Sequence, residues 1–193
     1  MRKQVLMAAV TLAGLAAFAG CKAPEFTVDA MREHFPPRAT ELDMLNPLIG
    51  TWDMEGQMKP NDDKTTPLKM KASMTFQWDC DKRLLVGRME GKVENELQMH
   101  ALEVWSWDPA SKSFLMTWQD GSGHIGKGHA KWDSAKREFK MSAKGKDLNS
   151  GADYVGKGVM KLVDDRTMEM TWSDYDGLGL FKMFDHTGTA KKR

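Results

Sequence analysis

The sequence predicts an all-β protein, an antiparallel up-and-down β-barrel of roughly eight to ten strands with a short N-terminal helix. From Gly50 onward, apolar and polar residues alternate with a period of two, as in strands that have one buried and one wet face. Acidic turn signals separate the alternating runs at short intervals. Because closure of the sheet removes its exposed edges, a barrel is favoured over an open sheet.

The first twenty residues have the features of an export signal. Arg2 and Lys3 are basic, and Val5–Ala19 is an apolar run that is too short for a spanning helix. The run ends in Phe18-Ala19-Gly20-Cys21, which resembles the lipobox of bacterial lipoprotein signals. In that family the cysteine becomes the new N-terminus and carries the acyl chains. The resemblance implies lipidation of Cys21 and attachment to a membrane through this lipid.

A second cleavage site competes with the lipobox. Ala17-Phe18-Ala19 matches the small-residue pattern of ordinary secretory cleavage, which would give a soluble secreted or periplasmic protein. Cys21 could then pair with Cys80, the only other cysteine. In the lipidated form, Lys22 lacks the aspartate linked to inner-membrane retention in enteric lipoproteins. The expected location is therefore the cell envelope, at the outer membrane facing the periplasm.

The rest of the chain divides into a tether over residues 21–39 and a barrel domain over residues 40–193. Prolines at positions 24, 36 and 37 interrupt helices and central strands in the tether. Removal of residues 1–20 takes away Arg2 and Lys3 and changes the formal net charge from +1 to −1. A near-neutral chain gives no electrostatic reason to expect a nucleic-acid partner.

The predicted helix begins at Thr40, where Thr40 and Asp43 offer an N-terminal cap, and it ends near Pro47. Its core-facing residues are Leu42, Leu45 and Leu48. The clearest strand is Lys69–Trp78, and similar alternation occurs around Trp52, Phe114, Phe139 and Met168. The turns between strands open on Asp79, Asp108, Asp133 and Asp164, whose side chains can accept backbone N–H groups ahead of them.

A weak internal repeat relates two hairpins. Ile125-Gly126-Lys127-Gly128 returns as Val155-Gly156-Lys157-Gly158, thirty residues later. The paired glycines have no phosphate-loop pattern and fall within strands, where glycine commonly marks bends.

Leu48-Ile49-Gly50-Thr51-Trp52, a short helix running into the first strand, resembles the start of the calycin barrels: lipocalins, fatty-acid-binding proteins and the nitrobindin-like group. In those families the tryptophan closes one end of the barrel. A closer resemblance is to the bacterial domain-of-unknown-function 1579 family. It rests on Leu48–Trp52, Val86–Gly91 and Trp105–Trp118 and covers about residues 41–185. This resemblance implies a calycin-like barrel and no established activity.

No catalytic constellation is visible in the sequence, and no cofactor is predicted. His124 and His129, like His100 and Glu103, have odd spacings that place them on opposite faces of a straight strand. Cys80 lies between two aspartates, which disfavour a reactive thiolate. Asp174-Tyr175-Asp176-Gly177 is interpreted as a turn. His186, placed after the last predicted strand, leaves haem binding of the nitrobindin-like kind as a minor alternative.

The leading hypothesis is non-enzymatic binding of a small hydrophobic ligand, such as a fatty acid or an apolar probe, inside the barrel. Unbranched thioethers adapt to varied apolar shapes and contact aromatic rings favourably. Arg88 is the candidate to orient a polar head group. The alternative is a filled barrel that acts as a structural or protein-interaction module of the cell envelope. The candidate ligand-binding residues are Trp52, Met54, Met74, Phe76, Arg88, Met116, Trp118, Met170 and Trp172.

Overall fold

The computed structural model describes residues 27–29, 37–62 and 64–193. Arg38–Arg193 form one compact unit, which holds the barrel. The export signal and Cys21 lie outside the described residues, as does most of the tether.

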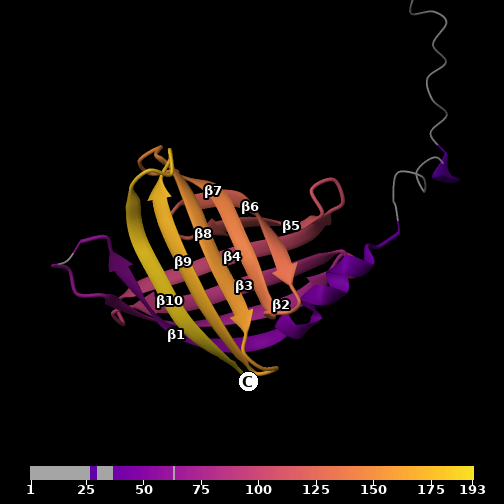
Figure 1. Ribbon diagram of the computed structural model, residues 1–193, viewed down its shortest axis with the longest axis horizontal. Coiled ribbons are helices and arrows are strands. Elements are labelled where there is room, and N and C mark those ends of the chain that lie inside the picture. The colour runs from indigo at the N-terminus through magenta and orange to yellow at the C-terminus, as the bar shows by residue number, and fades with distance from the viewer. Residues whose placement is uncertain (1–26, 30–36, 63) are drawn as a thin grey trace, which may run out of the picture. The chain divides into compact units, whose positions relative to one another are not determined.

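The fold is the predicted all-β barrel, with ten antiparallel strands and one short helix (Figure 1). Each strand pairs with the next one in the sequence, and β1 pairs with β10 to close the barrel. The strands are β1 (Gly50–Pro60), β2 (Leu68–Asp79), β3 (Leu84–Val93), β4 (Leu97–Asp108), β5 (Ser113–Asp120), β6 (His124–Asp133), β7 (Glu138–Asp147), β8 (Asp153–Leu162), β9 (Thr167–Asp176) and β10 (Lys182–Lys192).

The helix η1 (Thr40–Leu48) covers one end of the barrel and buries Leu42, Leu45 and Leu48, as predicted. It is a 3₁₀-helix, so residues three apart fall on the same face, and the spacing of the three leucines fits this geometry. The predicted cap at Thr40 is wrong: the N-cap is Ala39, and no side chain caps the helix. The helix ends at Leu48, next to Pro47, as predicted, and Pro47 lies in its last turn.

We call the end under η1 the closed end. Trp52 is fully buried there and donates its indole N–H to the Leu48 carbonyl at 2.7 Å. Trp105 packs edge-on against Phe139, and Phe114 packs against both of them. Since these aromatic side chains are almost completely buried, the closed end is filled by its own side chains.

All four predicted turns form at the closed end. Asp79, Asp108, Asp133 and Asp164 each accept a backbone N–H from one to three residues ahead, at 2.6–3.2 Å. The prediction that His186 lies after the last strand is wrong, because it lies in the middle of β10. The inward positions of β10 hold small or polar residues such as Gly188 and Ala190, so the strand lacks the apolar alternation of its neighbours.

Candidate functional site

The interior of the barrel differs between its two ends. In the closed half most inward-facing residues are buried, except Trp78, Trp107 and Trp132 at its rim, whereas toward the opposite, open end most of them are only half-buried. We call this solvent-reached part of the interior the open cup. Its apolar lining consists of Met58, Met70, Met89, Met99, Trp118, Met170 and Trp172.

The predicted ligand-binding residues fall into three groups. Five of them lie in the packed core of the closed half: Trp52, Met54, Met74, Phe76 and Met116. Three others line the open cup: Trp118, Met170 and Trp172. Arg88 is exposed on the outer face, because Gly87 and Met89 occupy the inward positions on either side of it. The expectation that Arg88 orients a ligand inside the barrel is therefore not supported.

The paired glycines make room for aromatic rings. The Trp118 ring lies over Gly126 of the adjacent strand, so a Cβ on this glycine would fall 2.2 Å from Trp118 Cζ2. In the same way, a Cβ on Gly156 would fall 2.1 Å from Trp172 Cζ2, and a Cβ on Gly145 would fall 2.3 Å from Tyr154 Cζ. Because each ring lies this close to a glycine, a larger side chain at that position would displace it. The bends predicted at these glycines are thus places where a ring lies against the wall.

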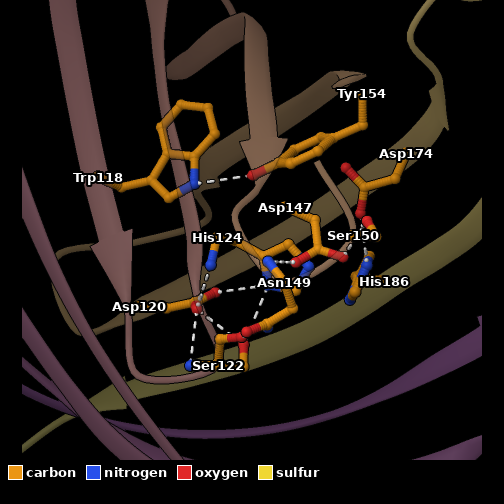
Figure 2. Close-up of polar contacts among 10 residues, drawn as sticks. All are labelled: Trp118, Asp120, Ser122, His124, Asp147, Asn149, Ser150, Tyr154, Asp174 and His186. Carbon is orange, nitrogen blue, oxygen red and sulfur yellow. Dashed lines mark hydrogen bonds and ion pairs between the residues drawn. The ribbon is translucent and has the colours of Figure 1, made fainter. Parts of the chain in front are cut away.

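Polar side chains of β5–β10 and the turns between them gather at the open end (Figure 2). The Asp120 carboxylate accepts the backbone N–H groups of Ser122 and His124, both at 2.9 Å, and the Ser122 hydroxyl at 2.7 Å. Ser122 Oγ and Asp120 Oδ2 both approach the same ring nitrogen of His124, Nδ1, at 3.0 and 3.3 Å. A hydrolytic triad needs its serine and its acid on opposite ring nitrogens. The cluster therefore orders the β5–β6 turn and does not form a nucleophile.

The β7–β8 turn is held by the same kind of contact. Asp147 accepts the Ser150 hydroxyl at 2.5 Å and the Asn149 backbone N–H at 2.9 Å, and these bonds hold the pKa of its carboxyl below the usual range. The Asn149 side chain donates to the Ser122 carbonyl at 2.6 Å and so ties this turn to the β5–β6 turn.

A third carboxylate lies between two strands on the other side of the opening. Asp174 accepts the Trp172 indole N–H at 2.7 Å and contacts His186 Nε2 at 2.9 Å (Figure 2). A histidine that ligates haem presents a free ring nitrogen to the iron. In His186, Nε2 is already engaged by a carboxylate.

Glu103 lies further inside, on β4. It faces the interior between Gly87 of β3 and Trp118 of β5, while His100 is exposed on the outer face of the same strand, as its spacing predicted. Burial raises the pKa of Glu103 to about 7, and the nearby Trp105 indole N–H opposes this rise. That N–H makes no hydrogen bond of normal geometry, although Trp105 is fully buried. Sequence reasoning considered Glu103 only as a metal ligand with His100 and missed its place in the interior.

The outer face carries a shallow depression of about 850 Å³ over strands β4–β8. Most of its lining residues occupy outward positions, among them Leu102, Ile125 and Lys144. Its lining also includes four inward residues, so it borders the wall of the cup: Trp118, Gly126, Gly145 and Tyr154. We therefore place the candidate site in the cup, where polar groups and half-buried apolar side chains converge.

Two further properties constrain the site. Within the described ranges, no group of three or more His, Cys, Asp or Glu side chains is arranged to hold a metal ion. No helix among these residues is long and apolar enough to cross a bilayer.

The loops and strand ends around the opening expose large apolar side chains: Leu97, Leu148, Leu178, Leu180 and Phe181.

Two solved structures share this fold. Rv2717c from M. tuberculosis matches with a TM-score of 0.61 and 9% identity over 81% of this chain and 99% of that one. The S-type phycobiliprotein lyase CPES from Guillardia theta matches with a TM-score of 0.54 and 7% identity, over 81% and 94% of the two chains. At these identities the likeness extends to the barrel fold alone.

No curated protein sequence matches the chain significantly. The family described as "Protein of unknown function (DUF1579)" matches residues 38–184, which span η1 and the barrel as far as β10. This range covers about three-quarters of the chain and agrees with the family resemblance at Leu48–Trp52. The chain therefore belongs to the DUF1579 family.

Proposed function

We propose that this protein is a non-enzymatic binding protein of the bacterial envelope that holds a small, largely apolar ligand in the open cup. The observation that carries the proposal is the contrast between the two halves of the interior. Inward methionines of the closed half such as Met116 and Met168 are 2% and 1% exposed, whereas Met89 and Met170 of the cup are half-buried. Flexible methionine side chains that line a solvent-accessible space can adapt to an apolar ligand, and the ligand would displace water from them.

The loops at the opening support entry of the ligand from this end. Leu178, Leu180 and Phe181 of the β9–β10 loop are 70–80% exposed, as expected for a surface that contacts an apolar partner or ligand during loading. A non-enzymatic role is favoured because Ser122 and His124 lack triad geometry. The match to a phycobiliprotein lyase is a likeness of fold, and a shared fold does not imply a shared reaction.

The test is a titration of the purified chain with diphenylhexatriene, a neutral rod whose fluorescence rises in apolar surroundings. We expect saturable binding at micromolar concentration. Ala101→Phe, which places a ring in the cup, should abolish binding. Leu102→Phe is the matched control, since Leu102 is the next residue on β4 and is 38% exposed on the outer face.

Native mass spectrometry of the purified chain would reveal any ligand retained from the cell. A discrete apolar mass that is lost on unfolding supports the proposal, and a haem mass would replace it with the haem alternative. No probe binding, together with identical native and denatured masses, would favour the filled barrel as an interaction module.

We further propose that the protein is anchored to the envelope through a lipid on Cys21, which lies outside the described residues. The support is the basic and apolar segment before Gly20-Cys21. Labelled palmitate should be incorporated by the wild type but not by Cys21→Ser, and the wild type should sediment with outer membranes. Secretion of an unlabelled wild-type chain would instead support cleavage after Ala19.

A further inference from the structure

The charges of the barrel are sorted between its two faces. Among the inward positions of the ten strands, Lys192 is the one Lys or Arg, and it lies at the closed end with Nζ 5.3 Å from the centre of the Trp52 ring. The lysines of β6 and β7, among them Lys127, Lys140 and Lys144, all occupy outward positions. The inward positions of the open half hold five carboxyl groups: Glu103, Asp120, Asp147, Asp174 and Asp176.

Four of these carboxyl groups have structural partners of their own. Asp120 and Asp147 accept backbone N–H groups of their turns, and Asp176 accepts those of Leu180 and Phe181. Asp174 is engaged by His186 and Trp172. Glu103 differs: among the described residues its carboxyl makes no hydrogen bond of normal geometry, although the Trp105 indole lies near it.

A fully buried indole N–H without a partner, as in Trp105, is costly in a folded protein, and the half-buried Glu103 carboxyl lies beside it. Both groups lie at the inner limit of the cup, where the half-buried surface of Met89 and Met170 meets the packed core. A positively charged group of a ligand at this point would favour the ionised Glu103 carboxylate, which could then also accept the indole N–H. The pair therefore indicates a recognition point rather than a packing feature.

Aromatic faces surround the same space. Trp118 is the cross-strand neighbour of Glu103, which places the two side chains about 5 Å apart at Cβ. The Trp118 ring lies against Gly126, and the rings of Trp172 and Tyr154 lie against Gly156 and Gly145 of the same wall. Cations bind to the faces of such rings, and most strongly to tryptophan.

We infer that the ligand of the cup carries a cationic nitrogen on an apolar body, with the nitrogen held between the Glu103 carboxyl and the face of Trp118. This inference rests on the proposed binding function and names the class of ligand. Anionic amphiphiles such as fatty acids are disfavoured, since a carboxylate in the cup would meet only carboxyl groups and neutral or paired side chains. The raised pKa of Glu103 supports the assignment, because a bound cation would restore the ionised form.

Three probes with the same apolar rod separate this inference from the proposed function. Diphenylhexatriene is neutral, its trimethylammonium derivative is cationic, and its propionic acid derivative is anionic. With the full chain at pH 8, we expect the cationic probe to bind about tenfold more tightly than the anionic one, corresponding to about 1.4 kcal/mol. In Glu103→Gln this preference should largely disappear, while the neutral probe still binds. Glu90→Gln, on the exposed outer face of β3, is the matched control and should retain the preference.

The outcomes are distinct. If the neutral probe fails to bind the wild type, the proposed function falls and the inference falls with it. If the neutral probe binds but the anionic probe binds as tightly as the cationic one, the inference alone is overturned. If the cationic preference survives in Glu103→Gln, the assignment to Glu103 is overturned, and circular dichroism of each variant verifies that its barrel is intact.

Discussion

Trp118 of β5 lies against Gly126 of β6, with two ring atoms 2.2 and 2.5 Å from the position that a Cβ on this glycine would occupy. The Lys144 carbonyl lies 2.8 Å from the same position, so an alanine there would clash with backbone as well as with the ring. The position of the Trp118 ring against the wall of the cup therefore requires a residue without a Cβ at position 126.

Gly126→Ala should destabilise the protein by about 1–3 kcal/mol, because overpacking forces the Trp118 ring and the β7 backbone to shift. Urea unfolding measures this cost, and tryptophan emission reports whether the ring has moved toward water. Gly121→Ala is the control, since the nearest atoms to its added Cβ are 3.7 Å away. Equal stability of the two variants would show that Trp118 does not depend on Gly126.

The alternation of residue types was sufficient to predict the antiparallel barrel, the four turns at the closed end and the three buried leucines of η1. It was not sufficient to divide the inward residues between a packed half and a wet half. Met116 and Met170 have the same local pattern, but only the registers around the closed barrel place one under η1 and the other in the cup. Side-chain alternation is local, whereas depth in a barrel depends on the tilt and stagger of all its strands.

Glu103 could have been identified from the sequence. In β4 the inward positions run through Met99, Ala101, Glu103, Trp105 and Trp107, so a single acidic residue interrupts an otherwise apolar set. A charged residue in such a set is rarely structural, because burial without a partner is costly. Arg88 was misplaced for the opposite reason: two inward positions of β3, Gly87 and Gly91, are glycines, so Met89 alone between them gives a weak apolar alternation.

Leu45→Ala should destabilise the protein by about 2–5 kcal/mol, since Leu45 is completely buried in the plug that η1 forms at the closed end. Chemical denaturation followed by circular dichroism gives the value. Met44→Ala, at the next position and 43% exposed, should change stability by less than about 0.5 kcal/mol. A small effect of Leu45→Ala would mean that η1 is not part of the cooperative core.

The half-buried contact between Asp174 and His186 should contribute more to stability than an exposed ion pair. Asp174→Ala leaves His186 and the Trp172 indole without their half-buried partner, at a cost of about 1–3 kcal/mol. Asp165→Ala breaks the pair with Arg137, where the Asp165 side chain is 91% exposed, and should cost less than about 1 kcal/mol. Urea midpoints at pH 6 and low salt compare the two, and a reversed order would argue against a structural role for Asp174.

Glu103 should make the protein less stable as the pH rises through neutrality. Its pKa in the folded protein is about 7, above its ordinary value of 4.5, so the folded state retains a proton that the unfolded chain has released. The contribution of Glu103 to the free energy of unfolding is therefore fully present below about pH 4.5. It falls as the pH rises from there and is lost above about pH 7, a total decrease of about 1–3 kcal/mol. The residues next to Glu103 in the interior are Gly87, Trp118, Ala101 and Trp105, none of which titrates in this range.

Urea unfolding of the wild type and of Glu103→Gln at pH 5 and pH 8 isolates this contribution, because the histidines and the aspartates of the turns are common to both proteins. Glutamine cannot ionise, so the variant should be more stable than the wild type at pH 8, and the difference should shrink at pH 5. Glu90→Gln, which alters an exposed carboxyl group on β3, should follow the wild type at both pH values. A wild type that lost no stability relative to Glu103→Gln between pH 5 and pH 8 would mean that Glu103 is ionised and well solvated in the cup.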